Sequence, residues 1–175
     1  MKKKLLTGII VFAVAGTAGT PAIPAVALSK KDKAVTSYQK FLKNHRGKSA
    51  IVDLDKNGVP ELVYSEPMIY GAVYTYNVKK GKRVCLKKVR YGKGGYIGYH
   101  KKKKMFVLCN SDTGGGRYEF FKVKKTKAIR KKKYVWVNGK HEPQKATING
   151  KKYSRDSFFI RLNKEEKGYV KLPQY

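Results

Sequence analysis

The chain has 175 residues and a formal net charge of +30 at pH 7, because 41 Lys and Arg residues oppose only 11 Asp and Glu residues. This length suits one domain. The three histidines share no metal-ligand spacing such as H-E-x-x-H, and no nucleic-acid-binding motif is present, so the protein classes defined by those motifs are excluded.

The first 27 residues predict a signal peptide. Lys2, Lys3 and Lys4 form a charged start, residues 5–15 are apolar, and Ala25-Val26-Ala27 matches a cleavage site. No cysteine follows the apolar run, and no later apolar stretch is long enough to cross a bilayer. We therefore expect an exported mature chain of residues 28–175, with a net charge of +27 once three lysines are removed, either released or held non-covalently at the cell wall.

Residues 28–48 predict an N-terminal helix, with its helical pattern over 29–46. Ser29 and Asp32 have the spacing of a capping box, and Arg46-Gly47 is a plausible end. Apolar residues recur at helical spacing at Val35, Tyr38, Phe41 and Leu42. We expect this apolar face to pack across a β-sheet.

Residues 53–62, in the β-rich region predicted over 49–175, carry oxygen ligands at the spacing of a calcium loop. Gly58 stands at position six, where such a loop turns sharply. Ca²⁺ takes six to eight oxygen ligands, and one short loop with this spacing supplies most of them. The sequence predicts a structural Ca²⁺ site. Its ligands are Asp53, Asp55, Asn57, Glu61 and the backbone carbonyl of Val59.

The segments that flank this loop predict strands rather than helices. Residues 49–52 and 61–64 are short, apolar and rich in β-branched or aromatic residues. An EF-hand needs a bidentate Glu at position twelve, where this chain has Tyr64. The alternative is a hairpin in which Asn57-Gly58 makes an Asx turn and the acids are solvated.

The pattern D-x-D-x-N-G-x-P-E-L resembles the strand-flanked calcium loops of FG-GAP repeats, with Glu61 where that family usually has Asp. A longer resemblance covers most of the mature chain. It is to small exported proteins of unknown function from Gram-positive, Clostridia-like gut bacteria, which combine a helix, a similar loop, Tyr- and Lys-rich hairpins and a closing I-N-G-K-x-x-S segment. Here that segment is 148–154. The second resemblance implies no activity.

Three hairpins of a repeat follow the loop. Tyr74, Tyr96 and Tyr118 are each 22 residues apart, and each begins an aromatic strand that ends in a basic turn. Return strands are expected over 84–89, 105–109 and 128–137, and a last strand over 168–172. We predict a mainly β (α+β) fold, an antiparallel meander with a partial-barrel or propeller-blade arrangement and an N-terminal helix. Ser154 predicts a short helix over 155–162, with a strand as the alternative.

The excess of positive charge predicts binding to polyanions. Lysines gather at the three turns, where solvated side chains are the alternative. The candidate residues are Lys79, Lys80, Lys82, Lys101, Lys102, Lys103, Lys104, Lys124, Lys125 and Lys127. An anionic cell-wall polymer or extracellular polysaccharide is the preferred partner because the chain is expected to be exported. Nucleic acid is the alternative, with Tyr96, Tyr99 and Phe121 either stacking on bases or filling a sheet face.

Cys85 and Cys109 lie in corresponding return strands, so the sequence permits either a disulfide or two separate small residues. Asp112-Thr113-Gly114 matches the D-T-G of aspartic proteases, but a hairpin loop is the simpler interpretation. The prediction is a secreted, monomeric, non-catalytic binding protein with one calcium loop. The alternatives are a secreted hydrolase or nuclease, a structural or inhibitory partner of another protein, and a domain without a metal.

Overall fold

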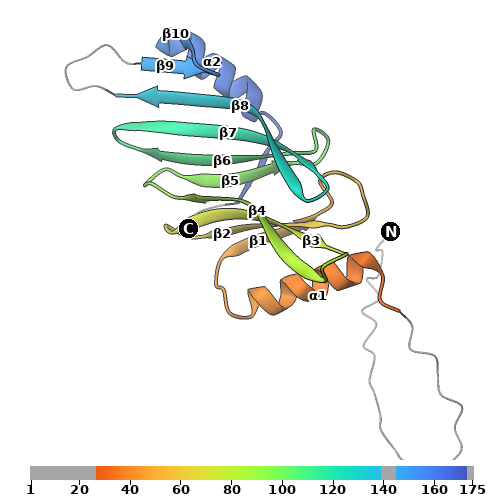
Figure 1. The fold of residues 1–175 in the computed structure, drawn as a ribbon. Coiled ribbons are helices and arrows are strands. Elements are labelled where there is room, and N and C mark those ends of the chain that lie inside the picture. Colours follow the sequence, from red (N-terminus) through yellow and green to blue (C-terminus); the bar gives the residue numbers. More distant parts are fainter. Residues whose placement is uncertain (1–26, 139–144, 173–175) are drawn as a thin grey trace, which may run out of the picture.

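The computed structural model describes residues 27–138 and 145–172, so all of the predicted signal peptide except Ala27 lies outside the described residues. Four layers follow one another: α1, a four-stranded sheet, a seven-stranded sheet and α2 (Figure 1). The elements are α1 (Lys30–Leu42), β1 (Lys48–Val52), β2 (Glu61–Glu66), β3 (Tyr70–Asn77), β4 (Lys82–Arg90), β5 (Tyr96–His100), β6 (Met105–Asp112), β7 (Gly115–Lys124), β8 (Lys127–Val137), β9 (Lys145–Ile148), β10 (Lys151–Tyr153), α2 (Arg155–Glu166) and β11 (Val170–Leu172).

The N-terminal helix is confirmed and begins at the expected cap. The Ser29 hydroxyl oxygen accepts a hydrogen bond from the Asp32 backbone N–H at 3.1 Å, which satisfies one of the free donors of the first turn. Tyr38 and Phe41 are buried against the four-stranded sheet. The helix ends at Leu42, earlier than expected, because the next residues make tighter i→i−3 hydrogen bonds instead of continuing the helix.

The four-stranded sheet has the order β1-β2-β3-β4, and every neighbouring pair is antiparallel. Strand β2 is buried on both faces. Leu62 and Tyr64 face α1, whereas Val63 faces the other sheet and lies opposite Val73. Strand β4 is an edge strand of this sheet, and five of its nine residues are Lys or Arg.

The seven-stranded sheet has the order β10-β9-β8-β7-β6-β5-β11 and is antiparallel throughout. It contains the second and third hairpins of the repeat, β5–β6 and β7–β8, and the expected last strand, β11. The first hairpin, β3–β4, belongs to the other sheet. The mainly β antiparallel prediction is therefore confirmed, but the meander is interrupted after β4, and neither sheet closes into a barrel.

The chain changes sheets through the glycine-rich segment 91–95. The Tyr91 hydroxyl hydrogen-bonds Ser65 in the four-stranded sheet at 2.8 Å, whereas the Gly94 N–H donates to the carbonyl of Ser111 in the seven-stranded sheet at 2.8 Å. A Cβ added at Gly92 would lie 2.5 Å from that same carbonyl oxygen. This close backbone approach requires glycine and permits the crossover.

The core between the two sheets contains apolar residues from both. The rings of Phe106 and Phe121 stack with centroids 5.1 Å apart, and Val63, Val73 and Leu54 meet them from the four-stranded sheet and the loop after β1. Two smaller clusters lie under α1 and under α2. The two sheets therefore depend on each other for burial of their inner faces.

The C-terminal segment is a helix, as preferred over a strand, and it is longer than predicted. The Ser154 hydroxyl oxygen accepts from the Ser157 N–H at 3.4 Å, and Phe158 and Leu162 are buried against the seven-stranded sheet. The turn before it has Asn149 and Gly150 at φ values of 51° and 87°. Two successive left-handed residues are the conformation expected of an Asn-Gly hairpin turn.

Candidate metal centre and basic end

The acidic loop, residues 53–61, connects the end of β1 to the start of β2. Strands flank it on both sides, as predicted. Lys56 and Gly58 have φ values of 60° and 81°. A Cβ at Gly58 would meet nothing within 4 Å, so the glycine is needed for its left-handed backbone and not for close packing.

Asp53 organises the loop through its backbone. Its two carboxylate oxygens accept hydrogen bonds from the N–H groups of Asn57, at 3.2 Å, and Gly58, at 2.9 Å. The Asn57 side-chain oxygen accepts from the Val59 N–H at 2.7 Å. These bonds are the Asx-type contacts expected of either a calcium loop or a simple turn, so they do not separate the two interpretations.

Glu61 differs from the solvated acids expected of a simple turn, because its side chain is fully buried. Its exposed fraction is 0%. The Leu54 backbone N–H donates to Oε2 at 2.8 Å, and the Thr75 hydroxyl donates to Oε1 at 3.2 Å. Burial raises the pKa of this carboxyl from 4.5 to about 8, against the lowering effect of the Leu54 N–H. A buried acid of this kind is costly unless a cation or a proton accompanies it.

Asp55 completes a cluster of three carboxylates. One oxygen from each of Asp53, Asp55 and Glu61 lies within 4.8 Å of the others. Asp55 Oδ2 accepts from the backbone N–H of Lys125 at 2.8 Å, whereas Oδ1 is buried and has no hydrogen-bond partner. A hard cation such as Ca²⁺ fits these oxygen donors.

None of these three carboxylates forms an ion pair with a described Lys or Arg residue. Elsewhere in the described chain, Glu119, Glu165 and Glu166 are paired with basic side chains, whereas Asp32, Glu66, Asp112 and Asp156 lie singly and form no ion pair with a described basic residue. In a chain with so large a positive excess, three adjacent acids without a basic partner are a site suited to an external cation. The structure brings together Asp53, Asp55 and Glu61. Asn57 and the Val59 carbonyl remain predicted ligands.

Two residues that the sequence pattern did not select support the acidic cluster. Thr75 is buried on β3 and reaches Glu61, and the Tyr38 hydroxyl of α1 donates to the Pro60 carbonyl at 2.8 Å. Each lies on an apolar strand or helix face, where the sequence pattern predicts only packing. The loop is therefore held from α1, from β3 and from the β7–β8 turn.

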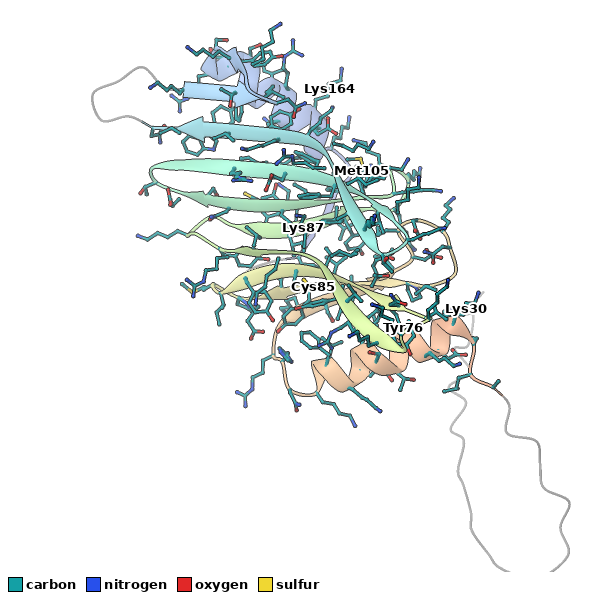
Figure 2. The ribbon with its side chains drawn as sticks, in the orientation of Figure 1. Lys30, Tyr76, Cys85, Lys87, Met105 and Lys164 are labelled. Carbon is teal, nitrogen blue, oxygen red and sulfur yellow. The ribbon has the colours of Figure 1, made fainter. Side chains whose placement is uncertain are left out.

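The three basic turns and the acidic loop lie at one end of the molecule, which we call the basic end. Antiparallel pairing puts the ends of β1 and β3 together, and likewise the ends of β5 and β7. The bond from Lys125 to Asp55 joins the two sheets there. Figure 1 shows these connections on the right, and Figure 2 places Tyr76 and Met105, which lie next to two of the turns, toward the same side.

The lysines predicted to bind polyanions are exposed, apart from the half-buried Lys104. Lys122 and Lys131 also border the basic end, but they lie inside strands and not at turn tips, so the turn pattern did not select them. The aromatic residues for which base stacking and packing on a sheet face were the two alternatives pack inward. Phe121 and Tyr99 join the core between the sheets, and Tyr96 packs in the cluster under α2.

The possible disulfide is not formed in the structure. Both cysteines are free: Cys85 is exposed and Cys109 is buried. Cys85 lies opposite Tyr74, which faces α1, whereas Cys109 lies opposite Tyr118, which faces α2. Equivalent positions in the repeat thus fall on the outer faces of different sheets, because the meander is interrupted after β4.

The other enzyme-like fragments have structural partners. The Asp112 side chain accepts a hydrogen bond from the Gly114 N–H at 2.8 Å, at the turn between β6 and β7. This contact agrees with the hairpin-loop interpretation. His45 stacks on Phe41, and His100 lies edge-on to Tyr169. His141 lies outside the described residues.

Comparisons with protein-family models, with curated proteins and with solved structures find no match to this chain. Among the described residues, neither helix combines the length and the apolar character needed to cross a bilayer.

Proposed function

We propose that the protein is an exported, non-catalytic binding protein that holds an anionic cell-wall polymer at its basic end, with one structural Ca²⁺ ion in the acidic loop. The observation that carries the proposal is the gathering of three lysine-bearing turns around a cluster of unpaired carboxylates. The cation would fix the loop, and the loop would hold the β7–β8 turn through Lys125.

The calcium part rests on three features of the loop. Three carboxylates converge within 4.8 Å, one of them is fully buried, and Asp55 Oδ1 has no partner. Carboxylates this close repel one another once they are ionised, and a divalent cation removes the repulsion. The strongly basic surroundings oppose cation binding, so we expect weak affinity, with a dissociation constant of about 10⁻⁴–10⁻³ M as in extracellular calcium modules.

The polymer part rests on charge and placement. Lysines on successive turns give a positive field that attracts phosphate- or carboxylate-bearing chains, with an affinity that falls as salt rises. A cell-wall polymer is preferred to nucleic acid for two reasons. The first 27 residues predict export, and the aromatic residues that would stack on bases pack in the core.

Calorimetry with CaCl₂ tests the first part. We expect saturable heat for the wild type and none for Asp53→Ala or Asp55→Ala, while an Asp112→Ala control binds as the wild type does. Asp112 is a suitable control because it is an exposed acid at the end of β6 that is remote from the loop. Identical, heatless titrations for all four proteins would contradict the calcium site.

Retention on immobilised teichoic acid tests the second part. We expect the protein to elute at a defined salt concentration. Replacing Lys101, Lys102, Lys103 and Lys104 with Gln should lower that concentration more than four Lys→Gln changes remote from the basic end. Equal losses in both variants would mean that net charge alone, and not the basic end, determines binding. Tighter, equally salt-sensitive retention on DNA would favour nucleic acid.

A further inference from the structure

A hollow at the basic end lies directly beside the acidic loop. It has a volume of about 410 Å³ and is lined by residues of the β5–β6 and β7–β8 hairpins together with Asp55. These hairpins are neighbours in the seven-stranded sheet, where Met105 pairs with Lys122. The lysines that line the hollow are Lys104, Lys122, Lys124, Lys125 and Lys131.

The chemistry of the lining suits a phosphate group without an attached base. Five of the lining residues are lysines, and the rest of the wall comes from Val123, Ile129 and Asp55. Among the described residues, no aromatic side chain lines the hollow. Single-stranded nucleic acids are usually held by stacking of bases on aromatic rings. The lining therefore favours a phosphodiester polymer of the alditol phosphate class over DNA or RNA.

Asp55 belongs to both the hollow and the acidic cluster. Of the described residues that line the hollow it is the only acid, and its Oδ2 accepts from the Lys125 N–H. Its Oδ1 is buried and has no partner, and one of its two oxygens lies in the carboxylate cluster with Asp53 and Glu61. A cation bound to the cluster would neutralise the one group in the hollow that repels an anion.

We propose that this hollow holds one phosphodiester group of the polymer, and that the anion and the cation at Asp53, Asp55 and Glu61 bind cooperatively. This inference rests on the proposed function and adds the class of ligand and its regulation. Linkage requires the effect to be mutual, so the polymer should tighten calcium binding by the same factor by which calcium tightens polymer binding. Coupling of this kind is typically about five-fold or more.

The first test measures binding of a synthetic poly(glycerol phosphate) oligomer by titration calorimetry in 1 mM CaCl₂. The Lys122→Gln/Lys131→Gln variant should bind about ten-fold more weakly than wild type, since each lost phosphate contact removes a charge-assisted interaction. The control Lys48→Gln/Lys93→Gln loses the same charge at exposed positions on the opposite strand ends. Its affinity for the oligomer should fall only about two-fold, because only the long-range electrostatic field is weakened. Thermal unfolding would confirm that both variants fold.

The second test uses Asp55→Asn, which keeps an oxygen for the Lys125 N–H but removes the charge. Wild type should bind the oligomer about five-fold more tightly in CaCl₂ than in EDTA at matched ionic strength. Asp55→Asn should bind tightly in EDTA and show no further response to calcium. A calcium response that persists in Asp55→Asn would mean that calcium acts on the polymer, and would overturn the coupling.

The outcomes separate this inference from the proposed function. Failure of the wild type to bind the oligomer contradicts the proposed function itself. Binding by the wild type with equal losses in the two double variants overturns the hollow as the site. Equal or tighter binding of a DNA oligonucleotide of the same charge, with the same loss in Lys122→Gln/Lys131→Gln, would assign the hollow to nucleic acid and overturn the ligand class.

Discussion

The Tyr38 hydroxyl donates a 2.8 Å hydrogen bond to the carbonyl oxygen of Pro60, the residue before Glu61. Tyr38 is itself fully buried between α1 and the four-stranded sheet. The bond therefore connects the helix packing on one face of the sheet to the acidic loop at its end. It also satisfies a backbone acceptor that lies away from water.

Removing this hydrogen bond should destabilise the protein. We expect Tyr38→Phe to lower the free energy of unfolding by about 1–2 kcal/mol, because the Pro60 carbonyl is left buried without its donor. Urea unfolding measures the change. Tyr99→Phe is the matched control, since no described residue hydrogen-bonds its hydroxyl, and it should differ little from wild type. Equal stability of the two variants would contradict a role for the bond.

Stability should depend on pH through Glu61. Its pKa is about 8 in the folded chain against an ordinary value of 4.5, so between these pH values the folded state keeps a proton that the unfolded state has lost. The contribution of Glu61 is therefore fully present below pH 4.5 and is lost as the pH rises to 8. Urea unfolding in EDTA should show this fall for wild type and not for Glu61→Gln.

Calcium should reverse this trend, because it binds the ionised carboxylate. With calcium present, stability at pH 8 should recover in wild type but not in Glu61→Gln. Parallel pH profiles for the two proteins in EDTA would show that Glu61 does not titrate in this range.

The stacked pair Phe106 and Phe121 should be essential for joining the sheets. We expect Phe106→Ala to cost about 3–5 kcal/mol, through lost burial and the cavity that remains. Ile160→Ala is the control, because Ile160 is 68% exposed on α2, and its effect should stay within about 0.5 kcal/mol. Equal effects of the two changes would contradict a core between the sheets.

The two cysteines should differ in reactivity. Cys85 is exposed and Cys109 is buried, and burial raises the pKa of both thiols, that of Cys109 to about 11. We expect one equivalent of maleimide to react rapidly with native protein and the second only after unfolding. Cys85→Ser should abolish the rapid phase. A native protein purified without reductant that shows no reactive thiol would indicate a disulfide.

Local sequence patterns were sufficient to predict much of the fold. Ser29 and Ser154 mark helix starts through a short-range cap, and Asn149-Gly150 marks a turn through its backbone preference. The positions of Asp53 and Asp55 in the loop likewise follow from spacing alone. In each case the determining contacts lie within a few residues, which a sequence displays directly.

Long-range contacts could not be predicted in the same way. Strand alternation looks alike in either sheet, so the repeat did not reveal that Cys85 and Cys109 face opposite outer layers. The bond between Asp55 and Lys125 spans 70 residues and depends on how the two sheets meet. The burial of Glu61 also depends on long-range packing. Its position in the loop could not predict it, because an acid at loop position nine is equally consistent with solvation.

The basic composition of β4 has a consequence apart from ligands. An edge strand exposes unpaired backbone groups on which a second chain can add its own strand. Five Lys and Arg residues along β4 make such an addition electrostatically unfavourable, since two copies would place like charges side by side. The basic residues of β4 thereby disfavour aggregation through this edge of the four-stranded sheet.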